Sequence, residues 1–416
     1  MDSNKTRFPR TRWFLLGAAF CVMMVISIYQ YSWFLFADHI QRELGWNMAS
    51  LGLIYTIFHY TSTMVLPFSG FIADTCGPTR VALGASLLVS AGFVLCALLP
   101  EQWTFRIFYG LGGVGGGVLY GLSTATAIKW FPDRRGFASG LVVFGFGAGT
   151  ALFNLGIEWL LEHEGLGGTF LWLGVGMLAT LIPLSLLYRF PELNPRTIDS
   201  QPAPVPPPRS MGPLEMLRTP QWYGVYFSFS LTVSVVLLFG AQMKTMARDY
   251  GLPDTHFQAL LVLFPLANGL SRVLAGAVSD KLGRERTMAL FYLLLGASVI
   301  ALLGLGRTPS LFVSTVLLAS LLGGAPFALY PATIGDYYGP RYATANYGLT
   351  YTAKAWAGLI SGWLSGYLVT VSGSYQVPLT VVAAGSFLAA ILSSPWILKP
   401  PASGVPPSSP REPEAR

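Results

Sequence analysis

The sequence predicts an all-α membrane protein in which twelve transmembrane helices form two pseudo-symmetric lobes of six helices each. Three observations predict this fold: a strongly apolar composition, a succession of membrane-length apolar runs, and an internal repeat. Of the 416 residues, 53% are hydrophobic and only 11% are charged, and the mean hydropathy is +0.54. These values lie far from those of a soluble globular domain, so the chain is expected to be an integral membrane protein that contacts the lipid bilayer.

Twelve apolar runs, each long enough to cross the hydrocarbon core as a helix, follow one another along the chain. They cover residues 13–36, 48–73, 81–99, 104–128, 137–160 and 168–189 in the first half, and 221–246, 256–279, 287–305, 310–335, 342–370 and 375–398 in the second. A Pro-rich segment from Pro191 to Pro213 separates the halves, because proline interrupts a continuous helix. We therefore expect an N-terminal lobe at 1–190, a cytoplasmic linker at 191–218, a C-terminal lobe at 219–399 and a disordered cytoplasmic tail at 400–416.

The two halves repeat each other in sequence. The loop after the second run, GFIADTCGPTR, returns after the eighth run as GAVSDKLGRER, with an offset of 206 residues. Four positions recur: Gly70, Asp74, Gly77 and Arg80 correspond to Gly276, Asp280, Gly283 and Arg286. The glycines permit a sharp turn, and each aspartate can accept hydrogen bonds at a helix end and pair with a nearby arginine. We expect these loops to steady one conformational state.

The distribution of basic residues predicts the orientation, since Lys and Arg in short loops stay on the cytoplasmic side. With the N-terminus inside, the external loops hold only Arg42, Arg106, Lys244, Arg248 and Arg307, and the other basic residues outside the spans fall on the cytoplasmic side. Both termini are thus predicted to be cytoplasmic, as in a protein of a prokaryotic inner (plasma) membrane. Topology then explains the net charge of +7, and no nucleic-acid partner is expected.

The sequence carries no motif that indicates an enzyme, a cofactor or a metal site. Its three cysteines lack the paired spacing of a disulfide framework or a metal site. Gly110, Gly112 and Gly115 match the spacing of a dinucleotide-binding loop, but no strand precedes them, so close helix packing is the better interpretation. Any transport would have to draw its energy from gradients.

Two cations lie in the interior of predicted spans, away from the span ends, and no Asp or Glu lies in the middle of a span. Arg272 is in the eighth run and Lys354 in the eleventh. A charge in the bilayer centre costs about 2.5–3.5 kcal/mol on insertion scales, whereas one ion pair at 4 Å contributes about 4 kcal/mol at an effective dielectric constant of 20. The equivalent positions of the first half hold Leu66 and Phe146, so the cations are not part of the repeated scaffold. We expect them to bind an anionic substrate; the alternatives are a bond from Arg272 to backbone carbonyls and a deprotonated Lys354.

Further polar side chains are candidates for the same site. Asn268 lies one helical turn before Arg272 and could orient it or bind the substrate. His59 is the only histidine within a predicted span; packing or an interhelical bond is favoured for it, with proton coupling as the alternative. Tyrosine hydroxyls could also face the substrate, although most transmembrane aromatics only pack. The candidates of this kind are Tyr31, Tyr120, Tyr330 and Tyr351.

The duplicated loop resembles the signature of the major facilitator superfamily, and the resemblance covers the whole chain. Six segments are similar to the oxalate/formate antiporter family: QYSW at 30–33, GVLYG at 117–121, WFPDRRGFASG at 130–140, EMLRTPQW at 215–222, SDKLGR at 279–284 and NYG…AKA at 346–355. This resemblance implies that Arg272 and Lys354 hold the carboxylates of the substrate inside an aromatic cage that includes Tyr31 and Tyr120.

The expected cage departs from that of the oxalate transporters at four positions. Gly323 and Phe327 stand where the family has Trp and Tyr, Phe146 replaces a Tyr, and Tyr351 replaces a Trp. The loss of an indole removes stacking surface and opens room. A bulkier or less symmetric carboxylate than oxalate is therefore an expected substrate.

The main functional hypothesis is a secondary active transporter, functional as a monomer, that exchanges small carboxylates for a counter-anion by alternating access. The alternative is proton-coupled symport of lactate, pyruvate or formate, as in the related monocarboxylate transporters. Some of those carry an Asp four residues before the arginine of the eighth span, where this sequence has Asn268. A third and more remote hypothesis is a sensor that binds a carboxylate without moving it.

Overall fold

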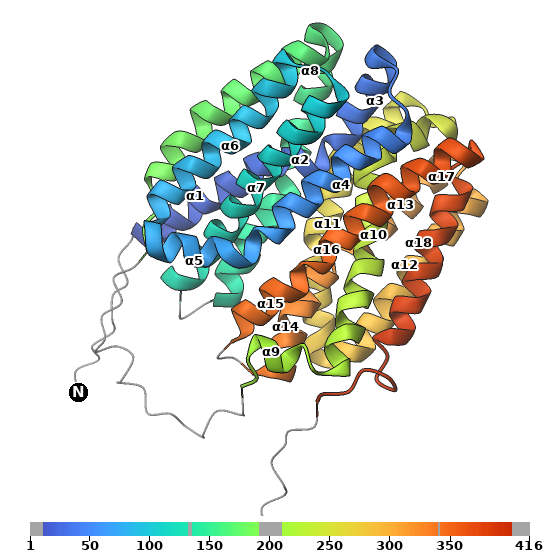
Figure 1. Cartoon of the computed structure of the whole chain (residues 1–416). Coiled ribbons are helices and arrows are strands. Elements are labelled where there is room, and N and C mark those ends of the chain that lie inside the picture. The colour runs from blue at the N-terminus through green and yellow to red at the C-terminus, as the bar shows by residue number, and fades with distance from the viewer. Residues whose placement is uncertain (1–10, 132–134, 191–209, 340–341, 402–416) are drawn as a thin grey trace, which may run out of the picture.

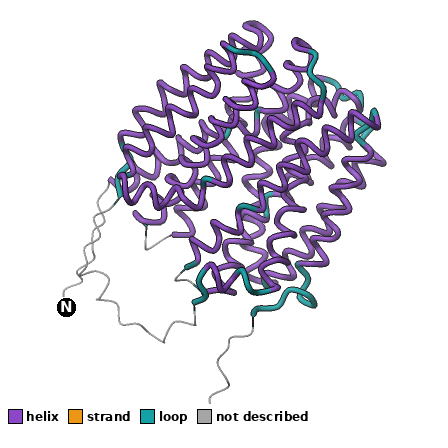
Figure 2. Tube along the Cα trace, viewed as in Figure 1, coloured by secondary structure: helices purple, strands orange, loops and turns teal. Residues whose placement is uncertain are grey.

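A computed structural model describes residues 11–131, 135–190, 210–339 and 342–401 of the chain. Within these ranges a few side chains, including that of Asp74, are not described. Helix covers nearly the whole described trace, and no strand occurs in it (Figure 2). The predicted all-α class is confirmed.

The first half contains six membrane spans. Its helices are α1 (Thr11–Ile26), α2 (Ile28–Tyr31), α3 (Trp33–Leu44), α4 (Met48–Met64), α5 (Leu66–Cys76), α6 (Pro78–Leu98), α7 (Gln102–Trp130) and α8 (Arg135–Leu186). The helices α1 to α3 follow one another as one span, as do α4 and α5. Gly165, with φ 67° and ψ −175°, divides the 52 residues of α8 into two spans. An unbroken helix of that length would measure about 78 Å, more than twice the thickness of the bilayer core.

The second half has the same organisation. Its elements are α9 (Pro213–Met216), α10 (Pro220–Asp249), α11 (Asp254–Leu282), α12 (Arg284–Leu305), α13 (Pro309–Gly323), α14 (Pro326–Tyr338), α15 (Ala343–Tyr351), α16 (Ala353–Leu359), the π-helix η2 (Ile360–Leu364), α17 (Ser365–Ser372) and α18 (Gln376–Leu392). The pair α13–α14 and the series α15–α17 each form one span. Grouped in this way, the described residues form twelve spans, and eight of their helical stretches meet a strict criterion of length and hydropathy for crossing a membrane. The two lobes lie side by side (Figure 1).

The backbone repeats with the offset that the sequence predicts. Three pairs of glycines have nearly equal positive φ angles: Gly45 and Gly251 (67° and 71°), Gly77 and Gly283 (85° and 89°), and Gly165 and Gly373 (both 67°). Members of a pair are 206, 206 and 208 residues apart. A residue with a side chain would be strained at such a φ angle, which explains the choice of glycine. The two glycines of each pair lie where equivalent helices of the two lobes end. The internal repeat is therefore a repeat of three-dimensional structure.

In the loop after α11 the aspartate pairs with a nearby arginine. Asp280 pairs with Arg284 (2.9 Å), which also contacts Asp336 (3.1 Å), whereas Arg286 is exposed. An arginine four residues after Asp280 returns to the same side of the chain, so it reaches the carboxylate more easily. In the first copy of this loop Arg80 is exposed, and the side chain of Asp74 is outside the described part.

The end of the predicted linker packs on the second lobe. The amide of Met211 donates to the carbonyl of Tyr338 (2.9 Å), and Asn346 Nδ2 donates to the carbonyl of Met211 (3.0 Å). Residues 191–209 and 402–416, which contain the rest of the predicted linker and nearly all of the predicted tail, lie outside the described residues.

The lobes meet closely at one end of the molecule. We call the end where α1 begins and α9 lies the near end, and the opposite end, where α3 and α17 stop, the far end (Figure 1). Towards the far end α4 packs against α16, η2 and α17 through four glycines, which we call the glycine seam: Gly52, Gly358, Gly362 and Gly366. A Cβ atom on Gly362 would lie 2.5 Å from the carbonyl oxygen of Gly52, so the two backbones are nearly in contact.

A hydroxyl reinforces the glycine seam. Thr56 Oγ1 donates to the carbonyl of Gly358 (2.9 Å) and accepts from the amide of Trp363 (3.0 Å). The second bond uses an amide of the π-helix η2, where the regular α-helical hydrogen-bond ladder is disturbed. One side chain of the first lobe thus bridges two backbone groups of the second.

Ion pairs form a second seam between the lobes. Asp38 of α3 is fully buried and contacts Arg248 of α10 (2.7 Å) and Arg42 (2.8 Å). Glu158 of α8 contacts Lys244 of α10 (2.5 Å). We call the pairs Asp38–Arg248 and Glu158–Lys244 the ionic seam; the first lobe supplies its carboxylates and the second its cations.

The two seams involve equivalent spans of the repeat but use different chemistry. The positions that correspond to Gly358, Gly362 and Gly366, 208 residues earlier, are Thr150, Asn154 and Glu158. Asn154 accepts from Ser32 (2.7 Å) and donates to the carbonyl of Leu261 (3.2 Å). The fifth span is therefore polar where the eleventh has glycine.

The glycine seam generates a prediction for the variant Gly362→Val. A side chain at this position overlaps the backbone of α4, and such overpacking costs about 1–3 kcal/mol, so the lobes should separate at the far end. Spin labels at the exposed positions Glu43 and Val371, in a background without the native cysteines, should report a longer distance by pulsed electron paramagnetic resonance.

The matched control is Gly304→Ala, because Gly304 lies in a helix and a Cβ atom added to it would meet no other atom within 4 Å. This substitution should leave the distance unchanged. An unchanged distance in Gly362→Val would contradict the role given to the seam.

Candidate functional site

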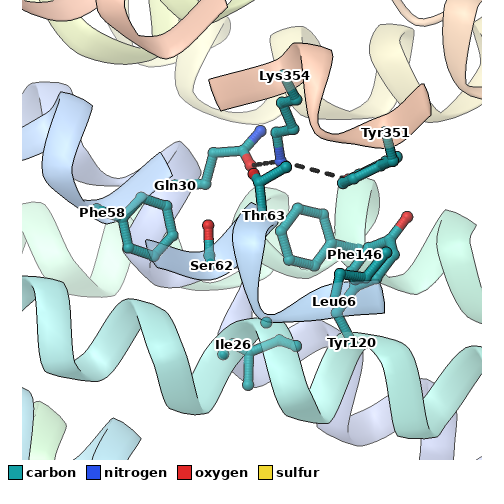
Figure 3. Close-up of a pocket in the computed structure, with 12 residues that line it drawn as sticks. Ile26, Gln30, Phe58, Ser62, Thr63, Leu66, Tyr120, Phe146, Tyr351 and Lys354 are labelled. Carbon is teal, nitrogen blue, oxygen red and sulfur yellow. Dashed lines mark hydrogen bonds between the residues drawn. The ribbon is translucent and has the colours of Figure 1, made fainter. Parts of the chain in front are cut away.

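A cavity between the lobes is lined by side chains from both of them (Figure 3). The first lobe supplies most of the lining and the second supplies two residues from α15 and α16. The lining consists of Ile26, Gln30, Phe58, Ser62, Thr63, Leu66, Gly116, Gly117, Tyr120, Phe146, Tyr351 and Lys354. Four of the residues predicted from the sequence, namely Lys354, Tyr120, Phe146 and Tyr351, thus meet at one place.

Breaks in three spans lie next to this cavity. Gln30 is in the four-residue helix α2, between the breaks at Ser27 and Ser32. Leu66 follows the break at Val65, and Lys354 follows the break at Thr352. The backbone stays in the right-handed helical region at each of these breaks, so every span continues past the cavity as helix.

Lys354 is buried and has a neutral partner from the opposite lobe. Its side-chain Nζ donates to Gln30 Oε1 at 2.7 Å and lies 3.5 Å from the hydroxyl of Tyr351 (Figure 3). The residue is 5% exposed. Among the described side chains no carboxylate lies within ion-pair distance of Lys354 or Arg272. The positive charge of Lys354 therefore has no counter-charge in this part of the chain.

Arg272 is half-buried at the boundary of the lobes and does not line the cavity itself. Its Nη1 donates to the carbonyl of Val143 in α8 at 2.6 Å, which corresponds to the backbone bond considered as an alternative. Its Nη2 lies 3.5 Å from Asn268 Oδ1, and its Nε has no partner in the described structure. Arg272 is held across the interface but keeps an unused donor.

Tyr31 and Asn268 connect the first lobe to Arg272. The hydroxyl of Tyr31 donates to Asn268 Oδ1 at 3.0 Å, and Asn268 Nδ2 donates to the carbonyl of Ser320 at 3.4 Å. Asn268 and Arg272 share a face of α11, as their spacing predicts. The amide oxygen of Asn268 thus faces two donors and orients both.

The predicted aromatic residues form a continuous cluster beside the cations. Ring contacts run from Tyr31 to Phe146 (5.8 Å), from Phe146 to Tyr120 (5.3 Å), from Tyr120 to Tyr351 (5.8 Å) and from Tyr351 to Phe327 (6.2 Å). The Phe327 ring centroid lies 4.9 Å from the guanidinium carbon of Arg272 and 6.0 Å from Lys354 Nζ. One ring therefore lies beside both cations, and its face partly stabilises their charge.

Two of the predicted residues lie outside this cluster. Tyr330 is one layer behind it, where its hydroxyl pairs with Ser228 (2.8 Å) and its ring packs on Phe229 (4.7 Å). His59 lies at the glycine seam, with its ring edge-on to Tyr55 (4.4 Å). Neither ring nitrogen of His59 has a hydrogen-bond partner among the described residues.

The space beside Gly323 is already filled. A Cβ atom at this position would overlap the side chain of Val236, so the absence of the family's Trp does not leave an open gap here. The expectation of extra room therefore does not apply next to Gly323.

Gln30, whose side-chain oxygen is the nearest hydrogen-bond acceptor of Lys354, is not among the residues predicted from the sequence. The signal available was a polar amide in an apolar run, directly before Tyr31 in the segment QYSW. A glutamine carries no charge and was not distinguished from other polar residues in spans. Thr63 was missed for the same reason.

Comparison with known proteins agrees with this architecture. The Major Facilitator Superfamily model matches residues 15–242 and 224–415, one match for each half of the chain. The chain belongs to the major facilitator superfamily. It is a multi-pass integral membrane transporter and not an enzyme, and the predicted fold is confirmed.

Several transporters are similar over most of the chain. The oxalate:formate antiporter of Oxalobacter formigenes is 31% identical over 387 residues, which cover 92% of this chain and 91% of the relative. The probable sulfoacetate transporter SauU of Cupriavidus necator is 24% identical over 408 residues (90% and 91%), and monocarboxylate transporter 13 of Bos taurus is 22% identical over 330 residues (78% and 74%). The resemblance to the oxalate/formate antiporter family is thereby confirmed.

The bond between Gln30 and Lys354 predicts the effect of Gln30→Leu. A hydrogen bond to a charged group contributes about 1.5–3 kcal/mol, and its loss leaves a buried ammonium without an acceptor. The purified variant should unfold at a lower temperature than the wild type. An added carboxylate should raise the unfolding temperature of the variant by more than it raises that of the wild type.

Gln242→Leu is the matched control for this measurement. Gln242 is a buried glutamine whose bond goes to the neutral carbonyl of Ser361 (3.4 Å), so its loss should cost less and should not be restored by carboxylate. Equal destabilisation of the two variants, with no effect of carboxylate, would argue against a special role of Gln30.

Proposed function

We propose that this transporter exchanges small carboxylates, such as oxalate, formate or related acids, by alternating access. The observation that carries the proposal is the pair of cations, Arg272 and Lys354, which hold the lobe interface without a described counter-charge. Lys354 has only a neutral acceptor at short range, and Arg272 retains a free Nε. The oxalate:formate antiporter among its relatives supports this substrate class.

The geometry suggests how a bound anion would act. A carboxylate that enters the cavity can replace Gln30 Oε1 as the acceptor of Lys354 and can offer a second oxygen to the donors of Arg272. Neutralising the two like charges stabilises the state in which the lobes enclose them. If the cavity can switch from one side of the membrane to the other only with an anion bound, each anion that enters the cell must be matched by one that leaves. Transport is then an exchange.

We further infer that the near end faces the cytoplasm of a prokaryotic cell, so that both termini are cytoplasmic. The distribution of Lys and Arg in the loops supports this orientation. One chain provides all residues of the cavity, which supports function as a monomer. The duplicated loops at Gly77 and Gly283 then lie on the cytoplasmic side, where we propose that they steady one conformational state.

The proposal predicts that Arg272→Gln and Lys354→Gln each lose exchange. Each variant removes one positive charge and leaves a shorter, neutral polar side chain, so the anion loses an ion pair in a low-dielectric site. Counterflow of labelled oxalate or formate in reconstituted vesicles should fall by more than about tenfold, as expected for the loss of a few kcal/mol.

Lys281→Gln is the control, because it removes an exposed cation near the end of α11 and should leave counterflow intact. Counterflow at the wild-type rate in either cavity variant would disprove the assignment of that cation.

The second candidate function is proton-coupled monocarboxylate symport, favoured by the unpaired nitrogens of His59 and by the monocarboxylate transporter among the relatives. The absence of a mid-span Asp or Glu in the sequence weighs against it. Dissipating the pH gradient separates the two functions: exchange between preloaded vesicles should persist, whereas concentrative symport should collapse.

The variant His59→Gln sharpens this test. Exchange predicts uptake that is independent of the pH gradient in both the wild type and the variant. Gradient-driven uptake that disappears only in His59→Gln would instead establish symport through this histidine.

A further inference from the structure

The hydroxyl of Thr63 is distinctive among the polar groups of the cavity. Thr63 lines the cavity from α4 and is 1% exposed. Its Oγ1 is the one polar side-chain atom of the described lining that is both buried and without a hydrogen-bond partner. A buried hydroxyl normally finds a partner, so this atom is free for a ligand.

In the described structure, the hydroxyl of Thr63 makes no hydrogen bond to the backbone of its own helix. Threonine hydroxyls within helices commonly donate to the carbonyl four residues earlier, as Thr232, Thr333 and Thr370 do here. Thr63 does not bond to the carbonyl of His59, which instead accepts from Ser62 (3.3 Å). The hydroxyl of Thr63 is therefore not satisfied by its own helix.

The cavity thus offers two kinds of polar group to one small molecule. Lys354, with Gln30 beside it, can take a carboxylate, and Thr63 extends from the neighbouring helix of the other lobe (Figure 3). A threonine hydroxyl can donate to a carbonyl or carboxylate oxygen and can accept from a hydroxyl. The lining near Thr63 also includes Ser62, whose hydroxyl already donates to the carbonyl of His59. Phe58 and Leu66 of the same lining are apolar.

We propose that Thr63 determines specificity by binding the oxygen function adjacent to the carboxylate of the substrate. This inference rests on the proposed carboxylate transport and narrows its substrate class. The favoured acids carry a second oxygen on the neighbouring carbon, as a hydroxyl, a carbonyl or a second carboxylate. Simple acids such as acetate leave the Thr63 hydroxyl unpaired, and a site that buries an unpaired polar group discriminates against them.

The test compares glycolate with acetate, which differ by one hydroxyl, and includes oxalate. Affinities are measured with the purified full-length protein by calorimetry or ligand-dependent thermal unfolding. The wild type should bind glycolate about tenfold more tightly than acetate, the ratio equivalent to one hydrogen bond of about 1.4 kcal/mol. Thr63→Val, which keeps the shape but removes the hydroxyl, should bind the two acids about equally.

Two variants provide controls. Thr63→Ser retains a hydroxyl and should retain the preference for glycolate. Thr126→Val removes a hydroxyl that is likewise buried and unpaired but lies outside the cavity, and it should bind both acids as the wild type does.

The outcomes separate this inference from the proposed function. Suppose that the acids bind and that binding depends on Lys354. If the wild type then binds glycolate and acetate equally, or if Thr63→Val still prefers glycolate, the role of Thr63 is overturned. Carboxylate binding stands in both cases. If none of the three acids binds, or if binding is the same in Lys354→Gln, carboxylate transport itself is overturned together with this inference.

Discussion

The constraint on which the site depends is the burial of a lysine ammonium with only a neutral acceptor. Lys354 and Gln30 belong to different lobes, and their 2.7 Å bond exists only while these lobes lie together. A buried charge is expensive unless it is hydrogen-bonded and paired. The protonated state of Lys354, the occupancy of the cavity and the position of the lobes are therefore linked, which is the kind of coupling that a gradient-driven carrier requires.

Much of the architecture is predictable from the sequence because it is determined by local patterns. The length of an apolar run is enough to indicate a span, and the duplicated loops with Gly77 and Gly283 indicate the repeat. The positive φ angles of these glycines explain why both copies of the loop have glycine at this position. Arg272 and Lys354 can also be identified from the sequence, because a charged residue within an apolar run stands out without knowledge of the structure around it.

The partners of those cations are not predictable in this way. Arg272 bonds to the carbonyl of Val143, a group that every residue possesses, and Lys354 bonds to a glutamine 324 residues earlier in the chain. Tyr330 resembles the cavity tyrosines in sequence but packs behind them, because the rotation of α14 is decided by tertiary packing. Such facts depend on which helix faces meet, which no single run of residues encodes.

The unlike seams at the far end have a mechanical consequence. Dissolved salt screens attraction between partly exposed charges but has little effect on backbone groups in van der Waals contact. Asp38 is buried and Glu158 and Lys244 are largely buried, so salt reaches the ionic seam mainly through the exposed side of Arg248. It leaves the contact at Gly362 unchanged. The two seams hold the lobes together by different forces, so resistance to separation differs from one side of the far end to the other.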